Sequence, residues 1–347
     1  MKLIQSVPWL ASTSLLLLAA LPSATFPGSV RAADELSYHS VKGLELEKHF
    51  VQHSSMKLVE LKLTVETPDG PQEPEIELPE TTITDDENLE FVEETLAAGE
   101  GRPAKLARSF ATVENSVTFE GGEGTESNTL KNESGLSGKK VVFSWDEDSK
   151  EFEAKWAEGE EGDDDLLGDL VEDADFRGWL PDKKTEEGAT WTIPASEFNN
   201  LQEPSGPMGY RPEGAEEEDE DEGSNDLRDN VKGEINATYK GTREVDGVKV
   251  GVIAFEGKLD SQSESEQESE EGPPAKTVTE NSVQIEGELL WDLSAGHFHA
   301  LTCDSEFKLT TSTSKTLEFG EQSFDLKEVR GFEGKKTYRF TCAAKKD

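Results

Sequence analysis

Alternation of polar and apolar residues is the feature that most restricts the fold of this chain. The clearest case is residues 57–65, which read K-L-V-E-L-K-L-T-V and end at the turn signal Thr67-Pro68-Asp69-Gly70. Successive side chains of a β-strand point to opposite faces, so this pattern predicts a strand with one buried face. Similar stretches recur along the chain, and the sequence therefore predicts a mainly β fold.

Three hairpins are predicted from short connections between such stretches. In residues 234–259 two β-rich arms flank Asp246-Gly247, a pair that favours the positive φ angles of a tight hairpin turn. A second hairpin joins residues 285–293 to residues 297–309 through Ser294-Ala295-Gly296. The third predicted hairpin pairs residues 140–145 with residues 152–156.

One amphipathic helix is predicted over residues 163–177. Three aspartates at its start suit an N-terminal cap and the helix dipole. Its apolar stripe consists of Leu166, Leu167, Leu170, Val171 and Ala174. A shorter helix is predicted over residues 196–201, whereas residues 87–98 fit either a helix or a strand. The expected fold class is mainly β (α+β), with one extended curved antiparallel sheet or two related sheets packed on the 163–177 helix.

The first 32 residues have the layout of a secretory signal peptide. Lys2 precedes an apolar run from Trp9 to Leu21, and Val30-Arg31-Ala32 fits a small-x-small cleavage site. We therefore expect export to the periplasm or the medium, and no transmembrane segment. The expected organisation is a signal peptide (1–32), a β-rich half (33–157) and a segment of helix plus antiparallel sheet (158–347).

Acidic residues dominate the surface chemistry. The net charge is -41, and removal of Lys2 and Arg31 with the signal peptide takes it to about -43. Such a charge repels nucleic acid and anionic membranes, which makes them poor partners. Acids concentrate in residues 158–165, and disordered acidic loops are predicted near 213–226 and 260–275. Solvated loops and loose divalent-cation sites are the two readings of these runs.

The chain has two cysteines, Cys303 and Cys342. In an exported protein they are candidates for a disulfide, which would close a loop of roughly 40 residues. Two unpaired buried thiols are the alternative reading.

Catalytic motifs are absent from the sequence. There is no Gly-x-Ser-x-Gly, no glycine-rich phosphate loop and no dinucleotide fingerprint, so no catalytic residue and no cofactor are assigned. His297 and His299 lie two apart on a predicted strand and are weak candidates for a metal site; His49 and His53 lie four apart. Because these motifs are missing, we expect a protein without enzymatic activity. The question stays open, since a pair of catalytic carboxylates cannot be recognised among so many acidic residues.

Several motifs carry a resemblance. They are residues 136–146 (LSGKKVVFSWD), 164–167 (DDLL), 176–181 (FRGWLP) and 188–192 (GATWT). In this order the chain resembles uncharacterised exported bacterial proteins of the kind found in planctomycete genomes. The strand pattern is more loosely similar to periplasmic carriers of the lipoprotein-localisation type, whose curved antiparallel sheet wraps a few helices. The resemblance implies export and assigns no activity.

The expected function is a non-enzymatic binding or carrier module of the cell envelope, with a hydrophobic ligand held between helix and sheet. An envelope interaction or assembly protein that binds divalent cations or a basic partner through its acidic loops is the alternative. A hydrolase with an unrecognised carboxylate site is the third reading. The sequence identifies no ligand-binding residue.

Overall fold

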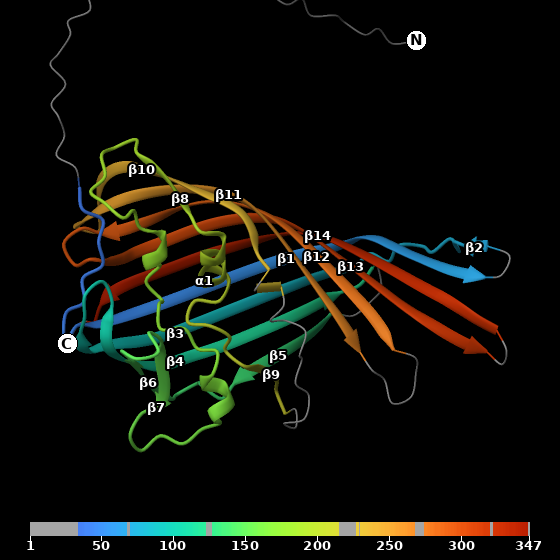
Figure 1. Ribbon diagram of the computed structural model, residues 1–347, viewed down its shortest axis with the longest axis horizontal. Helices are drawn as coiled ribbons and strands as arrows, with labels where there is room; N and C mark the ends of the chain where they lie inside the picture. Colours follow the sequence, from blue (N-terminus) through green and yellow to red (C-terminus); the bar gives the residue numbers. More distant parts are fainter. Residues whose placement is uncertain are drawn as a thin grey trace, which may run out of the picture. The chain divides into compact units, whose positions relative to one another are not determined.

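The computed structural model describes residues 34–67, 70–122, 127–214, 227–228, 230–267, 274–319 and 322–345. The predicted signal peptide therefore lies outside the described residues. The described strands form one 14-stranded antiparallel sheet, which is open and curved (Figure 1). The strands are β1 (Glu45–Thr67), β2 (Gly70–Gln72), β3 (Thr82–Ala98), β4 (Pro103–Glu120), β5 (Asn128–Ser134), β6 (Lys140–Trp145), β7 (Phe152–Trp156), β8 (Thr190–Ile193), β9 (Tyr210–Pro212), β10 (Lys232–Val245), β11 (Val248–Gln267), β12 (Ala275–Asp292), β13 (His297–Phe319) and β14 (Gln322–Ala344).

The main path of the sheet runs β7-β6-β4-β3-β1-β14-β13-β12-β11-β10-β8. Strands β1 and β14 lie side by side in antiparallel register from Leu46↔Ala344 to Glu66↔Asp325. This pairing joins the strands of the N-terminal part of the chain to those of the C-terminal part. The fold class predicted from the sequence is confirmed at this level.

Local turn chemistry explains the hairpins. Asp246 and Gly247 both have positive φ, 51° and 81°, and connect β10 to β11 as predicted. Gly296, with φ 72°, ends the turn between β12 and β13, where Asp292 Oδ1 accepts bonds from the backbone N–H groups of Ser294 and Ala295. The third predicted hairpin is β6–β7. Residues 87–98 belong to strand β3, which resolves the ambiguity of that stretch.

The predicted helix over residues 163–177 is wrong. Asp163 does cap a turn, but only the short 3₁₀ segment η1 (Asp164–Leu167) follows it. Further along, the carbonyls of Val171 and Glu172 accept bonds from the Arg108 guanidinium, and the Val171 N–H donates to Ser205 O. Tertiary partners thus take the backbone groups that an α-helix would pair internally.

One α-helix is present in the described part of the chain, α1 (Phe198–Gln202), close to the shorter helix predicted at 196–201. It follows the 3₁₀ segments η2 (Arg177–Trp179) and η3 (Ala195–Glu197). None of the described helices has the length and hydropathy needed to cross a bilayer. We call residues 157–211, apart from β8, the strap, because they cross one face of the sheet (Figure 1). That face is the inner face.

The three acidic runs differ in the structure that they adopt in the described part of the chain. Residues 158–163 form exposed or half-buried turns before η1. The 260–275 run is mostly strand, because β11 continues to Gln267 and β12 begins at Ala275, so the predicted disordered connection is wrong for those residues. The run at 213–226 lies almost entirely outside the described residues.

The core fills the space between strap and sheet with aromatic side chains. Phe50 stacks on Phe91 at 5.3 Å between ring centroids and contacts Phe340 edge-on at 4.8 Å. The strap contributes Phe176, stacked on Phe340, and Trp179, edge-on to Phe255 at 4.8 Å. Each of these rings is at most 4% exposed, so the strap is closely packed on this part of the sheet.

Candidate functional site

A buried ion network fixes the strap to the sheet and thereby decides which part of the inner face stays uncovered. Arg108 on β4 bonds the Glu93 carboxylate on β3 through Nε at 2.9 Å and also through Nη2, and its Nη1 contacts Ser205. Lys48 on β1 pairs with the same Glu93 and with Asp175 of the strap at 3.0 Å. The Lys48 and Arg108 side chains are fully buried.

Protonation in this network follows from burial and charge. Burial alone would raise the pKa of Glu93, but the neighbouring Lys48 and Arg108 cations outweigh it and lower that pKa. Burial raises the pKa of Glu172 to about 8, although Arg177 pairs with it. The network therefore links strands β1, β3 and β4 to the strap.

At the end of the strap lies a polar cavity of about 650 Å³. We call it the strap-end pocket. Glu87 of β3 accepts a 2.8 Å bond from the Tyr210 hydroxyl, and burial raises the pKa of Glu87 to about 7. Arg228 faces Glu203 at 3.0 Å on the other side. Further lining residues are Asp85, Asn115, Phe198, Met208, Leu259, Asn281, Val283 and Lys336.

One polar atom of the strap-end pocket has no hydrogen-bond partner among the described residues. Asn281 Oδ1 is buried and accepts no hydrogen bond. The half-buried Lys336 ammonium lies 5.2 Å from the centre of the Tyr338 ring and acts electrostatically on Glu87 and Glu203. Unsatisfied buried polar atoms carry a free-energy cost that a ligand can remove. Asn281 Oδ1 can therefore accept a hydrogen bond from a group that enters the pocket.

Beyond this pocket an apolar row crosses the inner face from strand to strand. The sheet register places Ile83, Met56, Gly334, Phe307, Val283 and Leu259 directly beside one another on β3, β1, β14, β13, β12 and β11. Leu58, Phe332 and Leu309 form a second row. We call these two rows the apolar band. Met56, Leu58, Ile83 and Phe332 are only half-buried, because the strap does not reach them.

Gly334 shows how closely the band is packed at its centre. A Cβ at this position would lie 2.5 Å from Phe307 Cζ and 2.8 Å from Met56 Cβ. The missing side chain lets Met56 and Phe307 approach each other across β14 and gives an unbroken apolar strip. On the left of Figure 1 the strap covers the sheet, whereas β1, β13 and β14 continue to the right beyond it.

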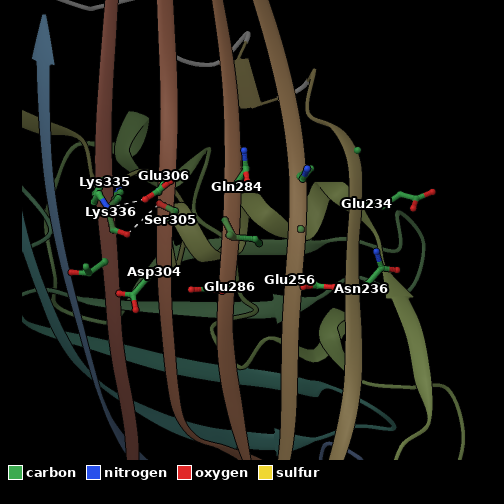
Figure 2. Close-up of a pocket in the computed structure, with 15 residues that line it drawn as sticks. Glu234, Asn236, Glu256, Gln284, Glu286, Asp304, Ser305, Glu306, Lys335 and Lys336 are labelled. Atoms are coloured by element: carbon green, nitrogen blue, oxygen red, sulfur yellow. Dashed lines mark hydrogen bonds and ion pairs between the residues drawn. The ribbon is translucent and has the colours of Figure 1, made fainter. Parts of the chain in front are cut away.

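The outer face carries a shallow trough with a volume of about 950 Å³ across β10–β14. Glu256, Glu286 and Asp304 lie directly opposite one another on adjacent strands. Figure 2 shows these carboxylates on neighbouring strands with the strap behind them. Asp304 pairs with Arg339 at 2.7 Å, whereas Glu256 and Glu286 form no ion pair among the described residues. Like charges placed opposite one another in a sheet are destabilising.

The candidate metal ligands do not converge. His297 is buried, and its Nδ1 lies 2.7 Å from Phe298 O and 3.5 Å from Cys342 Sγ; His299 is half-buried. His49 and His53 contact Asn88 and Asp86 on the outer face. Within the described ranges no group of three or more His, Cys, Asp or Glu side chains is arranged to hold a metal ion.

Cys303 and Cys342 do not form the predicted disulfide. Both are buried and free. In the register of β13 and β14, Cys303 lies opposite Tyr338, four residues from Cys342. That offset corresponds to about 13 Å along a strand, too far for an S–S bond. Burial raises the pKa of Cys303 to about 12, so its thiol is inert at neutral pH.

Sequence reasoning missed both the strap-end pocket and the apolar band. The band residues come from six strands, and only the inter-strand register brings them together. Alternation does assign Met56 and Phe307 to an apolar strand face, and this was the available signal. No local motif marks Glu87 or Lys336 as neighbours.

Comparisons with known proteins assign no family. No family model and no curated protein matches the chain. The similar solved structures include the Salmonella SPI-1 injectisome secretin InvG, at 8% identity and TM-score 0.16 over 88% of this chain and 66% of that one. They also include the Klebsiella pneumoniae type II secretion outer membrane complex (8% identity, TM-score 0.16, 88% and 41% covered) and the Pseudomonas putida toluene transporter TodX (5%, 0.11, 86% and 91%).

The chain thus spans just under two thirds of the InvG chain. At these TM-scores the similarities support no argument about this protein. The resemblance to exported planctomycete-type proteins stays a prediction.

Proposed function

We propose that this protein is an exported, non-enzymatic binding or carrier module for an amphiphilic ligand. The apolar part of the ligand lies along the apolar band, and its polar group enters the strap-end pocket. The observation that carries the proposal is the direct adjacency of these two surfaces on the uncovered inner face. Leu259 and Val283 belong to both.

Physical chemistry supports this pairing of surfaces. Half-buried aliphatic and aromatic side chains gain free energy when a ligand removes their remaining area from water, at about 25 cal/mol per Å². Asn281 Oδ1 and the Lys336 ammonium supply hydrogen-bonding groups at the end of the band. The sequence had suggested a ligand between helix and sheet, but aromatic side chains fill that space. The proposal therefore uses the part of the face next to the strap.

Binding of a dansyl-labelled medium-chain fatty acid tests the proposal by fluorescence titration. We expect Met56→Asp and Phe307→Asp to weaken binding by roughly tenfold or more, because each places a carboxylate in the apolar band. Val51→Asp is the matched control, since Val51 is 36% exposed on the opposite face of β1. Equal binding by all four proteins, or no binding by the wild type, would contradict the proposal.

The outer-face trough favours a second candidate function, the recognition of a basic partner. Its specific observation is the adjacency of Glu256 and Glu286, which form no ion pair among the described residues. A lysine-rich peptide should bind the wild type at low salt and bind Glu256→Gln/Glu286→Gln several-fold more weakly. Calorimetry with Ca²⁺ separates this candidate from simple cation binding, which millimolar calcium would reveal as measurable heat.

A further inference from the structure

Strand β7 ends the sheet on one side, and its outer backbone edge has no partner among the described residues. Backbone hydrogen bonds from Ala157 N to Lys140 O and from Asp146 N to Glu151 O fix the hydrogen-bond phase of the β6–β7 pair. In an antiparallel ladder every second residue bonds the neighbour. Residues 151, 153, 155 and 157 therefore face β6. Phe152, Ala154 and Trp156 direct their N–H and C=O groups outward.

A cavity adjoins β7 on the side of the strap. This cavity, of about 520 Å³, runs along all five residues of β7. Leu167 and Leu170 of the strap form its apolar wall. No proline and no bulge, two of the devices that block an exposed edge, interrupts β7.

We propose that β7 pairs with β7 of a second copy of this chain and joins two sheets across a two-fold axis at Ala154. In this antiparallel register Ala154 lies opposite the partner's Ala154, and Phe152 lies opposite the partner's Trp156. All three outward-facing residues then meet outward-facing residues. The hydrogen-bond phase that the β6–β7 pair imposes is thus compatible with self-pairing.

Charge complementarity selects the same register. Glu153 comes opposite the partner's Lys155, and Lys155 comes opposite the partner's Glu153. Within one chain these side chains pair at 2.7 Å and are 58% and 67% exposed, so both are free to exchange partners. Opposite charges facing each other across strands stabilise pairing, and the two-fold axis produces this contact twice.

The other end of the sheet does not offer the same opportunity. Tyr239 N donates to Ala189 O, so Thr190 and Thr192 face outward from β8, and the next outward position is Pro194. Proline has no N–H to donate. β8 is thus a protected edge of four residues, and β7 is the edge suited to a second copy.

Sedimentation velocity on the purified chain tests the pairing. We expect a monomer–dimer equilibrium whose dissociation constant rises roughly tenfold or more in Glu153→Lys, because two attractive contacts become repulsive. The double variant Glu153→Lys/Lys155→Glu should recover wild-type dimerisation. Glu306→Lys, which disrupts the exposed Glu306–Lys335 pair on another strand, is the control and should leave the equilibrium unchanged.

Cross-linking checks the register independently of affinity. Residues in a hydrogen-bonded antiparallel pair have Cα atoms about 5.5 Å apart, within disulfide range. Ala154→Cys should therefore yield a covalent dimer on mild oxidation, whereas Ala300→Cys on β13 should not. A strictly monomeric wild type, a dimer insensitive to Glu153→Lys, or equal cross-linking of both cysteine variants would overturn the proposal.

Discussion

The strap covers one part of the inner face and leaves another part uncovered, and the side chains in these two parts differ in how far they are buried. Under the strap, Phe50 is 1% exposed and lies among three other phenylalanines. Phe332, on the neighbouring strand β14 and opposite Leu58, is half-buried. The same alternating pattern thus yields a rigid core in one region and a candidate binding surface in the other.

The position of the boundary between the two regions follows from the buried ion network. Arg108 and Lys48, which both pair with Glu93, bind the strap. Arg108 bonds Val171, Glu172 and Ser205, and Lys48 pairs with Asp175. Because these bonds are formed away from water, they fix where the strap lies more firmly than surface ion pairs would. The comparison indicates that polar contacts inside the core determine how much apolar surface stays available to a ligand.

Removing Arg108 should have the largest effect. Arg108→Ala leaves Glu93 with one cationic partner and deletes a guanidinium that lies 4.7 Å from the ring centres of both Phe91 and Phe143. We expect a loss of about 5 kcal/mol in the free energy of unfolding, measured by urea denaturation. Lys308→Ala, which removes an exposed ion pair, is the control and should cost less than about 1 kcal/mol. Similar losses would show that the network does not hold the strap.

Truncation of matched phenylalanines compares the two regions directly. Phe50→Ala should lower the free energy of unfolding by about 4 kcal/mol, because it opens a cavity in a closely packed core. Phe332→Ala should cost about 1 kcal/mol, because solvent already reaches this ring. Thermal and urea unfolding measure both. Equal costs would mean that the apolar band is as closed as the core.

Titration of Glu172 should give a smaller effect confined to the strap. Its pKa is raised from 4.5 to about 8, so the folded protein binds this proton more tightly than the unfolded chain. The free energy of unfolding therefore falls as pH rises from about 4.5 to 8. In Glu172→Gln this fall should be about 1 to 3 kcal/mol smaller than in the wild type. Parallel stability profiles between pH 5 and 8.5 would contradict this prediction.

The features predicted correctly from the sequence depend on neighbouring residues. Asp246-Gly247 specifies its hairpin because both residues accept positive φ, and the alternation of residues 57–65 specifies part of strand β1. The helix prediction over 163–177 failed because Arg108, more than 50 residues earlier, takes the carbonyls of Val171 and Glu172. The disulfide prediction failed because the two cysteines lie four residues apart in the register of β13 and β14. Register is a property of the pair of strands, and Cys303 lies opposite Tyr338.

The sequence by itself determined a β-rich chain with hairpins at defined turns and a strongly negative net charge. These properties depend on side-chain periodicity, turn conformations and net charge, which act over a few residues or over the whole composition. Tertiary structure alone decided that β1 lies beside β14 and where the strap ends on the sheet. Both depend on contacts between residues far apart in the chain. For this reason the strap-end pocket, the apolar band and the free edge of β7 become visible only in the folded protein.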